Sequence, residues 1–194
     1  MIVTPSDLRY VNQQDIGGGT TSMIETVEEG TLVFSGSSST TTTATVTSFD
    51  ESRTMLEDLG QSVDTATAND QHRLLQRCSV TNDTTITGTR ANGNTSSNST
   101  GGFKLTQYAD GLINSIQDGT ITLGSGVTSA TATISSISTS KYLLSNLGVT
   151  LSSGTTNESR HNVRITLTNP TTVTATRGST GDTCIVGFMA GDCA

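Results

Sequence analysis

The sequence predicts an all-β protein: two tandem small antiparallel β-sandwich domains, immunoglobulin-like in architecture, each with one short helical turn. Ser and Thr make up about a third of the 194 residues, and Thr is a good strand former. Apolar residues alternate with these threonines, and the same landmarks occur twice along the chain. We expect an N-terminal arm at 1–22, a first domain at 23–109 and a second at 110–194.

Several short sequence motifs occur twice along the chain, in the same order. "TTITGTR" at 84–90 returns as "TTVTATR" at 171–177. Three further pairs keep nearly the same offset, about 87–89 residues: "EEGTLVF" (28–34) with "QDGTITL" (117–123), "TATVTS" (43–48) with "TATISS" (131–136), and "SRTMLEDLG" (52–60) with "SKYLLSNLG" (140–148). One match between Thr-rich strings could be chance, but four in order indicate a tandem duplication.

The first elements of each copy are predicted strands. In 119–123 the apolar residues alternate with Thr, which is the period of a half-buried strand. Ala132 and Ile134 continue this pattern into a second strand. Five or six such strands in about 80 residues are typical of a small antiparallel sandwich.

A helical turn is expected next, at 140–147. Leu144 and Leu147 are three apart, as on one side of a helix, and Gly148 supplies a left-handed stop. The first copy repeats this with Leu56, Leu59 and Gly60. Because so short a helix is marginal alone, we expect it to plug an open end of the sheet core.

The last part of each copy is a predicted hairpin followed by a closing strand. Val163, Ile165 and Leu167 alternate with polar residues, and Asn169-Pro170 turns the chain. On the return strand the residues expected to face the core are Val173 and Ala175, while Arg177, like Arg90, marks the strand's end. Closing strands are expected near 103–105 and 184–186.

The chain has three cysteines, which do not make a disulfide framework. Cys78 takes the place of Ile165 in its copy, which indicates a buried structural thiol. For Cys184 and Cys193 a local bridge, a bridge between subunits and two free thiols all stay open.

Composition argues against several classes of partner. The net charge is −7 with two lysines, Lys104 and Lys141, so the chain lacks the basic stripe of a nucleic-acid binder and the polybasic segment of an anionic-membrane binder. No apolar run approaches the roughly 20 residues that span a bilayer. The first residues are already polar, unlike a signal peptide, so synthesis in a cytoplasm is expected.

No residue is predicted to be catalytic, cofactor-binding or metal-binding. A hydrolase elbow G-x-S-x-G is missing from the sequence, and Cys, His and carboxylates do not cluster at ligand spacing. His72 and His161 recur with the repeat, so a shared structural position explains them better than catalysis. We therefore expect no enzyme activity and no cofactor.

Two kinds of segment lie outside these patterns. Gly17-Gly18-Gly19 makes a flexible joint behind the arm, which is either an attachment segment or a frayed terminus. The stretches 62–69 and 91–102 are polar and rich in Gly, Asn and Ser, and we expect them to be loops.

The succession "DGTITLGSG…SATATISSISTSKYLLSNLG…VRITLTNPTTVTATRG" resembles a repeated β unit of structural proteins in tailed bacteriophages. The resemblance covers about 24–190 but not the arm. Its characteristic parts are "G-T-[IL]-x-[LF]", "S-[KR]-x-x-L-x-x-L-G" and "TT-[VI]-T-x-T-R". The first copy departs from the pattern at Gln76, Cys78 and Gly88, so its domain is expected to pack differently.

The resemblance implies a non-enzymatic, multicopy virion protein of decoration, collar or tail-fibre type. It would attach to the head, neck or tail through the arm or one domain, with other virion proteins and itself as partners. A symmetric homo-oligomer is expected, with a trimer preferred. The alternatives are a receptor- or glycan-binding adhesin acting through polar loops and, less favoured by the missing motifs, an enzyme.

Overall fold

The computed structural model describes residues 22–35, 39–63, 75–90, 98–152 and 158–194. The N-terminal arm expected at 1–22 and its glycine joint lie almost wholly outside these residues, and so does His72. The described part of the chain is all-β, as the sequence predicts.

The described residues form twelve strands and two short 3₁₀ turns. In chain order these are β1 (Ile24–Phe34), β2 (Thr41–Thr45), η2 (Glu51–Arg53), β3 (Thr54–Val63), β4 (Gln76–Asn82), β5 (Thr85–Arg90), β6 (Ser99–Tyr108), β7 (Ile113–Leu123), β8 (Ser129–Thr133), β9 (Tyr142–Leu151), η4 (Glu158–Arg160), β10 (Val163–Asn169), β11 (Thr172–Arg177) and β12 (Cys184–Cys193). All described strand pairs are antiparallel.

The two halves of the chain, β1–β6 and β7–β12, have the same strand order. The first pairs β1–β6–β3 and β2–β5–β4; the second pairs β7–β12–β9 and β8–β11–β10. The likeness extends to single hydrogen bonds. In the β4–β5 turn Asn82 Oδ1 accepts the Thr84 N–H at 3.0 Å, and in the β10–β11 turn Asn169 Oδ1 accepts the Thr171 N–H at 3.0 Å. Short polar side chains therefore set both hairpin turns in one way.

The helical turn predicted at 140–147 is wrong, because β9 occupies Tyr142–Leu151. Leu144 and Leu147 lie on opposite faces of this strand: Leu144 packs on the second half's core, whereas Leu147 belongs to the first half's core. Gly148 is a bulge glycine with φ +90° and not a helix stop. The equivalent prediction in the first copy fails in the same way.

In that first copy β3 runs through Thr54–Val63 and bulges at Gly60, whose φ is +88°. Leu56 is buried while Leu59 is exposed, so these leucines also face opposite sides of a strand. The described helical structure in this region is η2, which ends where β3 begins.

Each half packs an aromatic ring over an edge-strand glycine. Gly30 on β1 pairs with Phe103 on β6, and Gly119 on β7 pairs with Phe188 on β12. A Cβ at Gly30 would lie 2.4 Å from Phe103 Cζ, so the ring fills the place of the missing side chain. In each half, this glycine–phenylalanine pair packs the first strand against the central strand of its sheet.

The predicted departures of the first copy are matched by changes of volume. Where the second half buries Leu123 and Ala175, the first half buries Phe34 beside Gly88, and a Cβ on this glycine would meet the Phe34 ring at 3.1 Å. A larger residue on one sheet is thus offset by a smaller one on the other. The first half keeps its fold while its core is rearranged.

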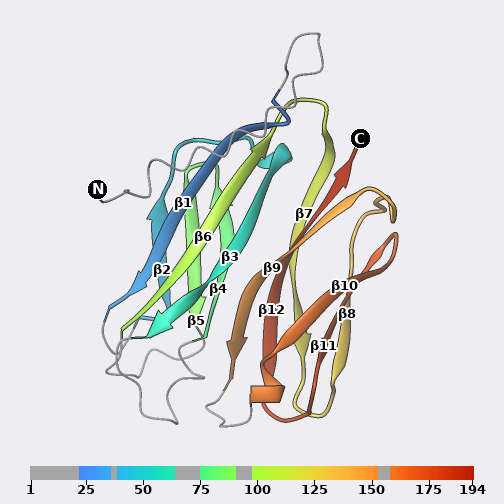
Figure 1. The fold of residues 1–194 in the computed structure, drawn as a ribbon. Helices are drawn as coiled ribbons and strands as arrows, with labels where there is room; N and C mark the ends of the chain where they lie inside the picture. Colours follow the sequence, from blue (N-terminus) through green and yellow to red (C-terminus); the bar gives the residue numbers. More distant parts are fainter. Residues whose placement is uncertain (1–21, 36–38, 64–74, 91–97, 153–157) are drawn as a thin grey trace, which may run out of the picture.

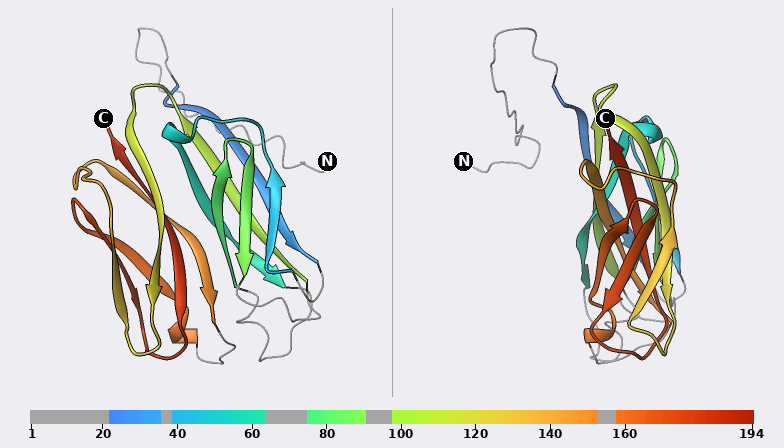
Figure 2. Two further views of the ribbon diagram at one scale, coloured as in Figure 1. Left: turned by 180° about the vertical axis from the view of Figure 1, so that it is seen from behind. Right: turned by 90° about the vertical axis from the view of Figure 1, so that its right-hand side faces the viewer.

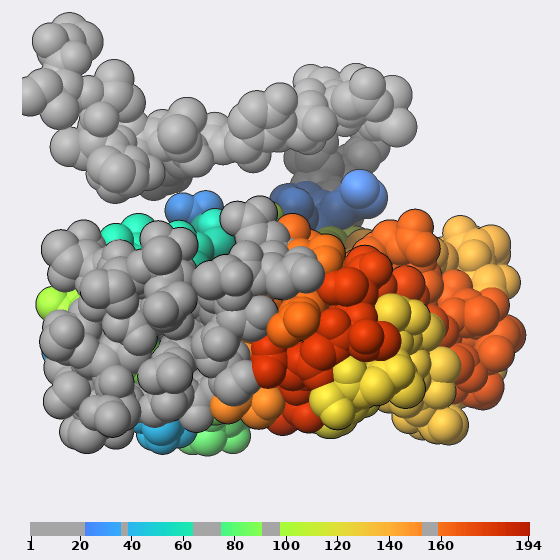
Figure 3. Space-filling view, turned by 90° about the horizontal axis from the view of Figure 1, so that it is seen from below, coloured from blue at the N-terminus to red at the C-terminus, as the bar shows by residue number. Residues whose placement is uncertain are grey.

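The halves lie side by side along their strands, as Figure 1 and Figure 2 show. Seen from below in Figure 3, the orange, red and yellow second half lies beside the blue and green first half. Strand β4 joins β9 through the pair Arg77–Gly148, so β2–β5–β4–β9–β12–β7 is one continuous sheet. The two halves therefore share a sheet.

Strand β12 is buried on both faces. Val186 and Phe188 point into the second half's core, whereas Met189 packs with Leu147 in the first half's core. The Leu56 backbone N–H also donates to the side-chain sulfur of Met189, with the N and Sδ atoms 3.2 Å apart. A sheet covered on both faces reads as a continuous apolar run, and "CIVGFMAG" at 184–191 is one.

The predicted core residues of the hairpins are confirmed, since Val173, Ala175 and Cys78 are all buried. Part of the loop expected at 91–102 is strand, because β6 begins at Ser99. Residues 64–69 and 91–97 lie outside the described residues.

The three cysteines are free thiols. Cys184 and Cys193 begin and end β12, so at about 3.3 Å per residue they lie about 30 Å apart. A disulfide requires Cα atoms within about 7 Å, and a local bridge between them is excluded. Burial raises the pKa of Cys78 to about 12 and that of Cys184 to about 11, which makes both unreactive at neutral pH.

Candidate functional site

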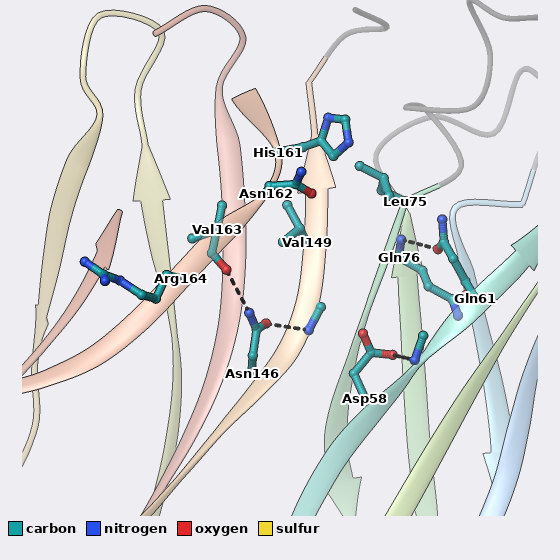
Figure 4. A pocket seen from close by; sticks show the side chains of 12 residues that line it. Asp58, Gln61, Leu75, Gln76, Asn146, Val149, His161, Asn162, Val163 and Arg164 are labelled. Atoms are coloured by element: carbon teal, nitrogen blue, oxygen red, sulfur yellow. Dashed lines mark hydrogen bonds between the residues drawn. The ribbon is translucent and has the colours of Figure 1, made fainter. Parts of the chain in front are cut away.

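An open groove of about 660 Å³ lies at the joint between the halves. Strands β3 and β4 supply one wall, and β9 with the start of β10 supplies the other (Figure 4). The lining side chains of interest are polar: Asp58, Gln61, Asn146, His161, Asn162 and Arg164. The groove exists because the second half docks beside β3 and β4.

Two of these polar side chains hold the bulges. Asp58 Oδ1 accepts the Gly60 N–H at 3.2 Å, and Asn146 Oδ1 accepts the Gly148 N–H at 2.9 Å. The two residues occupy equivalent positions, two before each bulge glycine. Their role is local and structural, because a left-handed glycine at a bulge leaves an N–H that the ladder does not satisfy.

Other lining groups are also used by the backbone. Asn146 Nδ2 donates to the Val163 carbonyl at 3.3 Å, and Gln61 Oε1 accepts the Gln76 N–H at 3.0 Å (Figure 4). These contacts tie β9 to β10 and β3 to β4. The amides of the groove thus fix the edges of the two sandwiches.

The chemistry open to this groove is limited. None of its described lining residues is Ser, Thr, Cys, Lys or Tyr, so they supply no hydroxyl, thiol or amine nucleophile. Asp58 is the one carboxylate among them, whereas general acid–base hydrolysis of glycosides uses two. The arrangement can contact a polar ligand through His161 and Asn162 (Figure 4).

Burial raises the pKa of Asp58 above its ordinary value of 3.8, and the hydrogen bond from Gly60 N–H opposes this effect. The folded state therefore holds the proton more tightly than the unfolded state. Between pH 3.8 and the raised value, stability falls as pH rises, and the cost of the buried charge is fully present above that window.

Replacing Asp58 with Asn, the residue of the second half, is expected to raise the free energy of unfolding at pH 7. The amide keeps the acceptor for Gly60 N–H and removes the desolvated charge. Urea unfolding at a series of pH values measures this, and the gain should shrink toward acidic pH. Asp118→Asn, an exposed strand position in β7, serves as the control and should show no such trend. A gain that stays constant with pH would contradict the assignment.

Buried arginines close one end of each sandwich. Arg177 at the end of β11 is 3% exposed. Its guanidinium donates five hydrogen bonds to four backbone carbonyls, with N···O distances from 2.6 to 3.3 Å: Gly124, Val127, Arg160 and Asp182. One side chain thereby bonds to three connecting segments: the β7–β8 loop, the end of η4 and the β11–β12 loop.

Arg90 is the equivalent residue of the first half, 1% exposed at the end of β5. Its Nε donates to the Ser39 carbonyl at 2.8 Å, and its guanidinium carbon lies 4.9 Å above the Phe34 ring. Burial lowers the pKa of this guanidinium. The sequence-based prediction that both arginines mark strand ends is confirmed, but their burial was missed. The burial could have been predicted from the two motifs "TTITGTR" and "TTVTATR", because each has an Arg at the same position and no other charged residue.

The described ranges contain neither a cluster of metal-ligating side chains nor a helix that could span a membrane. Within them, no three His, Cys, Asp or Glu side chains are placed to hold a metal ion together. The described part of the chain also contains no helix with the length and apolar character needed to cross a membrane. Of the two histidines, His161 lines the groove and His72 is not described.

Comparison of the chain with protein families, with curated proteins and with solved structures found no match.

Proposed function

We propose that this chain is a non-enzymatic structural component of a tailed-phage particle, present in several copies. It is a pair of tandem immunoglobulin-like β-sandwich units that attaches to the head, neck or tail through residues 1–22 or through one unit. Its partners are other virion proteins and further copies of itself. The duplicated β motifs, which resemble those of phage structural proteins, support the assignment.

The main observation behind the proposal is that equivalent polar side chains make equivalent structural contacts in the two halves. Asp58 and Asn146 hold bulges, while Arg90 and Arg177 close the sandwich ends, and each pair repeats its role in both halves. Polar side chains that have a structural role in both copies are typical of a domain that was duplicated for a structural function. A catalytic site would instead break the local rules of one copy.

Particle association is the direct test. Particles lacking this chain are mixed with the purified protein, sedimented and analysed by quantitative mass spectrometry. We expect saturable binding of several copies per particle, and a protein truncated to residues 23–194 reports whether the preceding segment is the anchor. Purified particles that neither contain nor bind the chain would contradict the proposal.

A receptor- or glycan-binding role is the second candidate, and the open groove is the observation that favours it. His161 and Asn162 present polar groups there (Figure 4). Aromatic platforms for sugar rings are scarce, however, since Tyr142 is the one aromatic residue among the exposed large hydrophobic residues of the described ranges. A glycan array distinguishes the two roles: binding that is lost in Asn162→Ala would favour the adhesin.

A further inference from the structure

The contact between the halves joins two different surfaces. The first half contributes its β3–β4 edge, and the second contributes the outer face of the sheet β7–β12–β9. The Arg77 side chain lies across Gly187, where a Cβ would meet Arg77 Cδ at 2.8 Å. Cys78 Sγ lies 3.5 Å from the Leu147 carbonyl oxygen. The edge of one unit thus packs on the face of the next.

Such a contact is heterologous, so each unit has both an edge and a face. The chain uses one edge and one face internally. This leaves the outer face of β1–β6–β3 on the first half. On the second half β9, the counterpart of β3, already pairs with β4, so the part of the equivalent edge that remains unpaired is β10, whose first residues line the groove at the joint. Because the two halves are equivalent position by position, the residues of this face and this edge can be compared with the residues that form the contact between the halves.

The unused face carries counterparts of the buried contact residues. Ile116 packs in the joint three residues before Gly119, and Val27 stands three before Gly30. Leu147 precedes its bulge glycine in the joint, as Leu59 precedes Gly60. Val27 is 54% exposed and Leu59 is 51% exposed.

A glycine recurs on this face as well. Gly187, over which Arg77 lies, precedes Phe188, and Gly102 precedes Phe103. The face therefore retains both the apolar positions and the gap that accepts an arginine stem.

The unused edge carries the counterpart of Arg77. Arg77 is the second residue of β4, and Arg164 is the second residue of β10. Arg164 is exposed on an edge strand of the sheet β10–β11–β8. On the unused face Lys104 lies between Glu29 and Glu57 in the cross-strand register and forms an ion pair with Glu57, so this group carries one net negative charge, opposite in sign to Arg164.

We propose that copies of this chain join head to tail by repeating the internal contact. The β10 edge of one copy, with Arg164, docks on the outer face of β1–β6–β3 of the next copy, with Arg164 over Gly102 and against Leu59 and Val27. The occupant of the exposed apolar face is thus a second copy of the chain. Repetition of a heterologous contact closes into a ring when the rotation between units permits it.

This proposal rests on the proposed function only in assuming that several copies meet at one place. The solution experiment needs no particle. Self-association can therefore fail while particle binding succeeds, and the reverse.

Sedimentation velocity over a range of concentrations tests the proposal with the full-length protein. The wild type should self-associate. Leu59→Lys blocks the face and Arg164→Glu blocks the edge, and each alone should weaken association about tenfold or more. Val127→Lys is the matched control: Val127 is an exposed apolar residue just before β8, the edge of β10–β11–β8 opposite to β10, and this variant should associate as the wild type does. Thermal unfolding confirms that each variant is folded.

Mixing the two blocked variants identifies the geometry. Leu59→Lys retains an intact edge and Arg164→Glu retains an intact face, so an equimolar mixture should form a 1:1 dimer and stop there. A contact between identical surfaces would give no such recovery. A wild type that stays monomeric, variants that associate normally, or a mixture that stays monomeric would each overturn the proposal.

Discussion

Replacing Arg177 with methionine is expected to lower the free energy of unfolding by about 3 kcal/mol. The apolar side chain fills much of the volume but leaves four buried carbonyls without the donors that Arg177 provides. For a chain of this size, the melting temperature should fall by roughly 6–12 °C. Urea unfolding followed by far-UV circular dichroism measures the change.

Arg164→Met is the matched control for this substitution. It makes the same chemical change on an exposed position of β10, within the same half. At high dilution it should alter the free energy of unfolding by less than about 0.5 kcal/mol. Equal losses in the two variants would show that the carbonyl network around Arg177 does not stabilise the fold.

Replacing Gly148 with alanine is expected to cost about 3 kcal/mol or more. Two effects add: the left-handed backbone at φ +90°, and a Cβ that would lie 2.3 Å from the Gln76 carbonyl oxygen across the joint. Because that oxygen belongs to backbone, the joint must open to admit the methyl group. Urea unfolding of the variant measures the combined cost.

Gly60→Ala separates the two effects. This glycine has φ +88° at the equivalent bulge, but a Cβ there meets nothing within 4 Å. It should therefore cost about 1 kcal/mol, from the backbone alone. If both alanine variants lost the same stability, the contact between the halves would contribute nothing.

The hairpins could be predicted from the sequence because their signals are local. Asn82 and Asn169 stand at the turns, and Val173 and Ala175 alternate with polar residues, so both turn and facing follow from neighbours in the chain. The duplication strengthened the prediction by giving each element a second example.

The helical turn was a wrong prediction for a physical reason. Leucines three apart share one side of a helix but take opposite sides of a strand. The sequence does not reveal that Leu144 and Leu147 each have a core to pack against. A better signal was present in "DLG" and "NLG", because an Asp or Asn two residues before Gly is suited to accept the glycine N–H at a bulge.

The groove could not be predicted, because its two walls come from strands far apart in sequence. Asp58 and His161 line the same groove only because one half docks on the other. That docking was visible solely as the apolar run of β12, in which Met189 stands where the first half has Lys104. A half-buried charged residue in one copy and a buried apolar residue at the same position of the other indicate a sheet face that is covered in one copy only.

We expect the two β units to unfold as one body, because they share a sheet. Calorimetry of the full chain, at a dilution where it is monomeric, tests this most directly. We predict a single transition in which the calorimetric and van't Hoff enthalpies agree, shifted as a whole to lower temperature by Gly148→Ala. Two separate transitions, one of them unmoved by Gly148→Ala, would contradict the account.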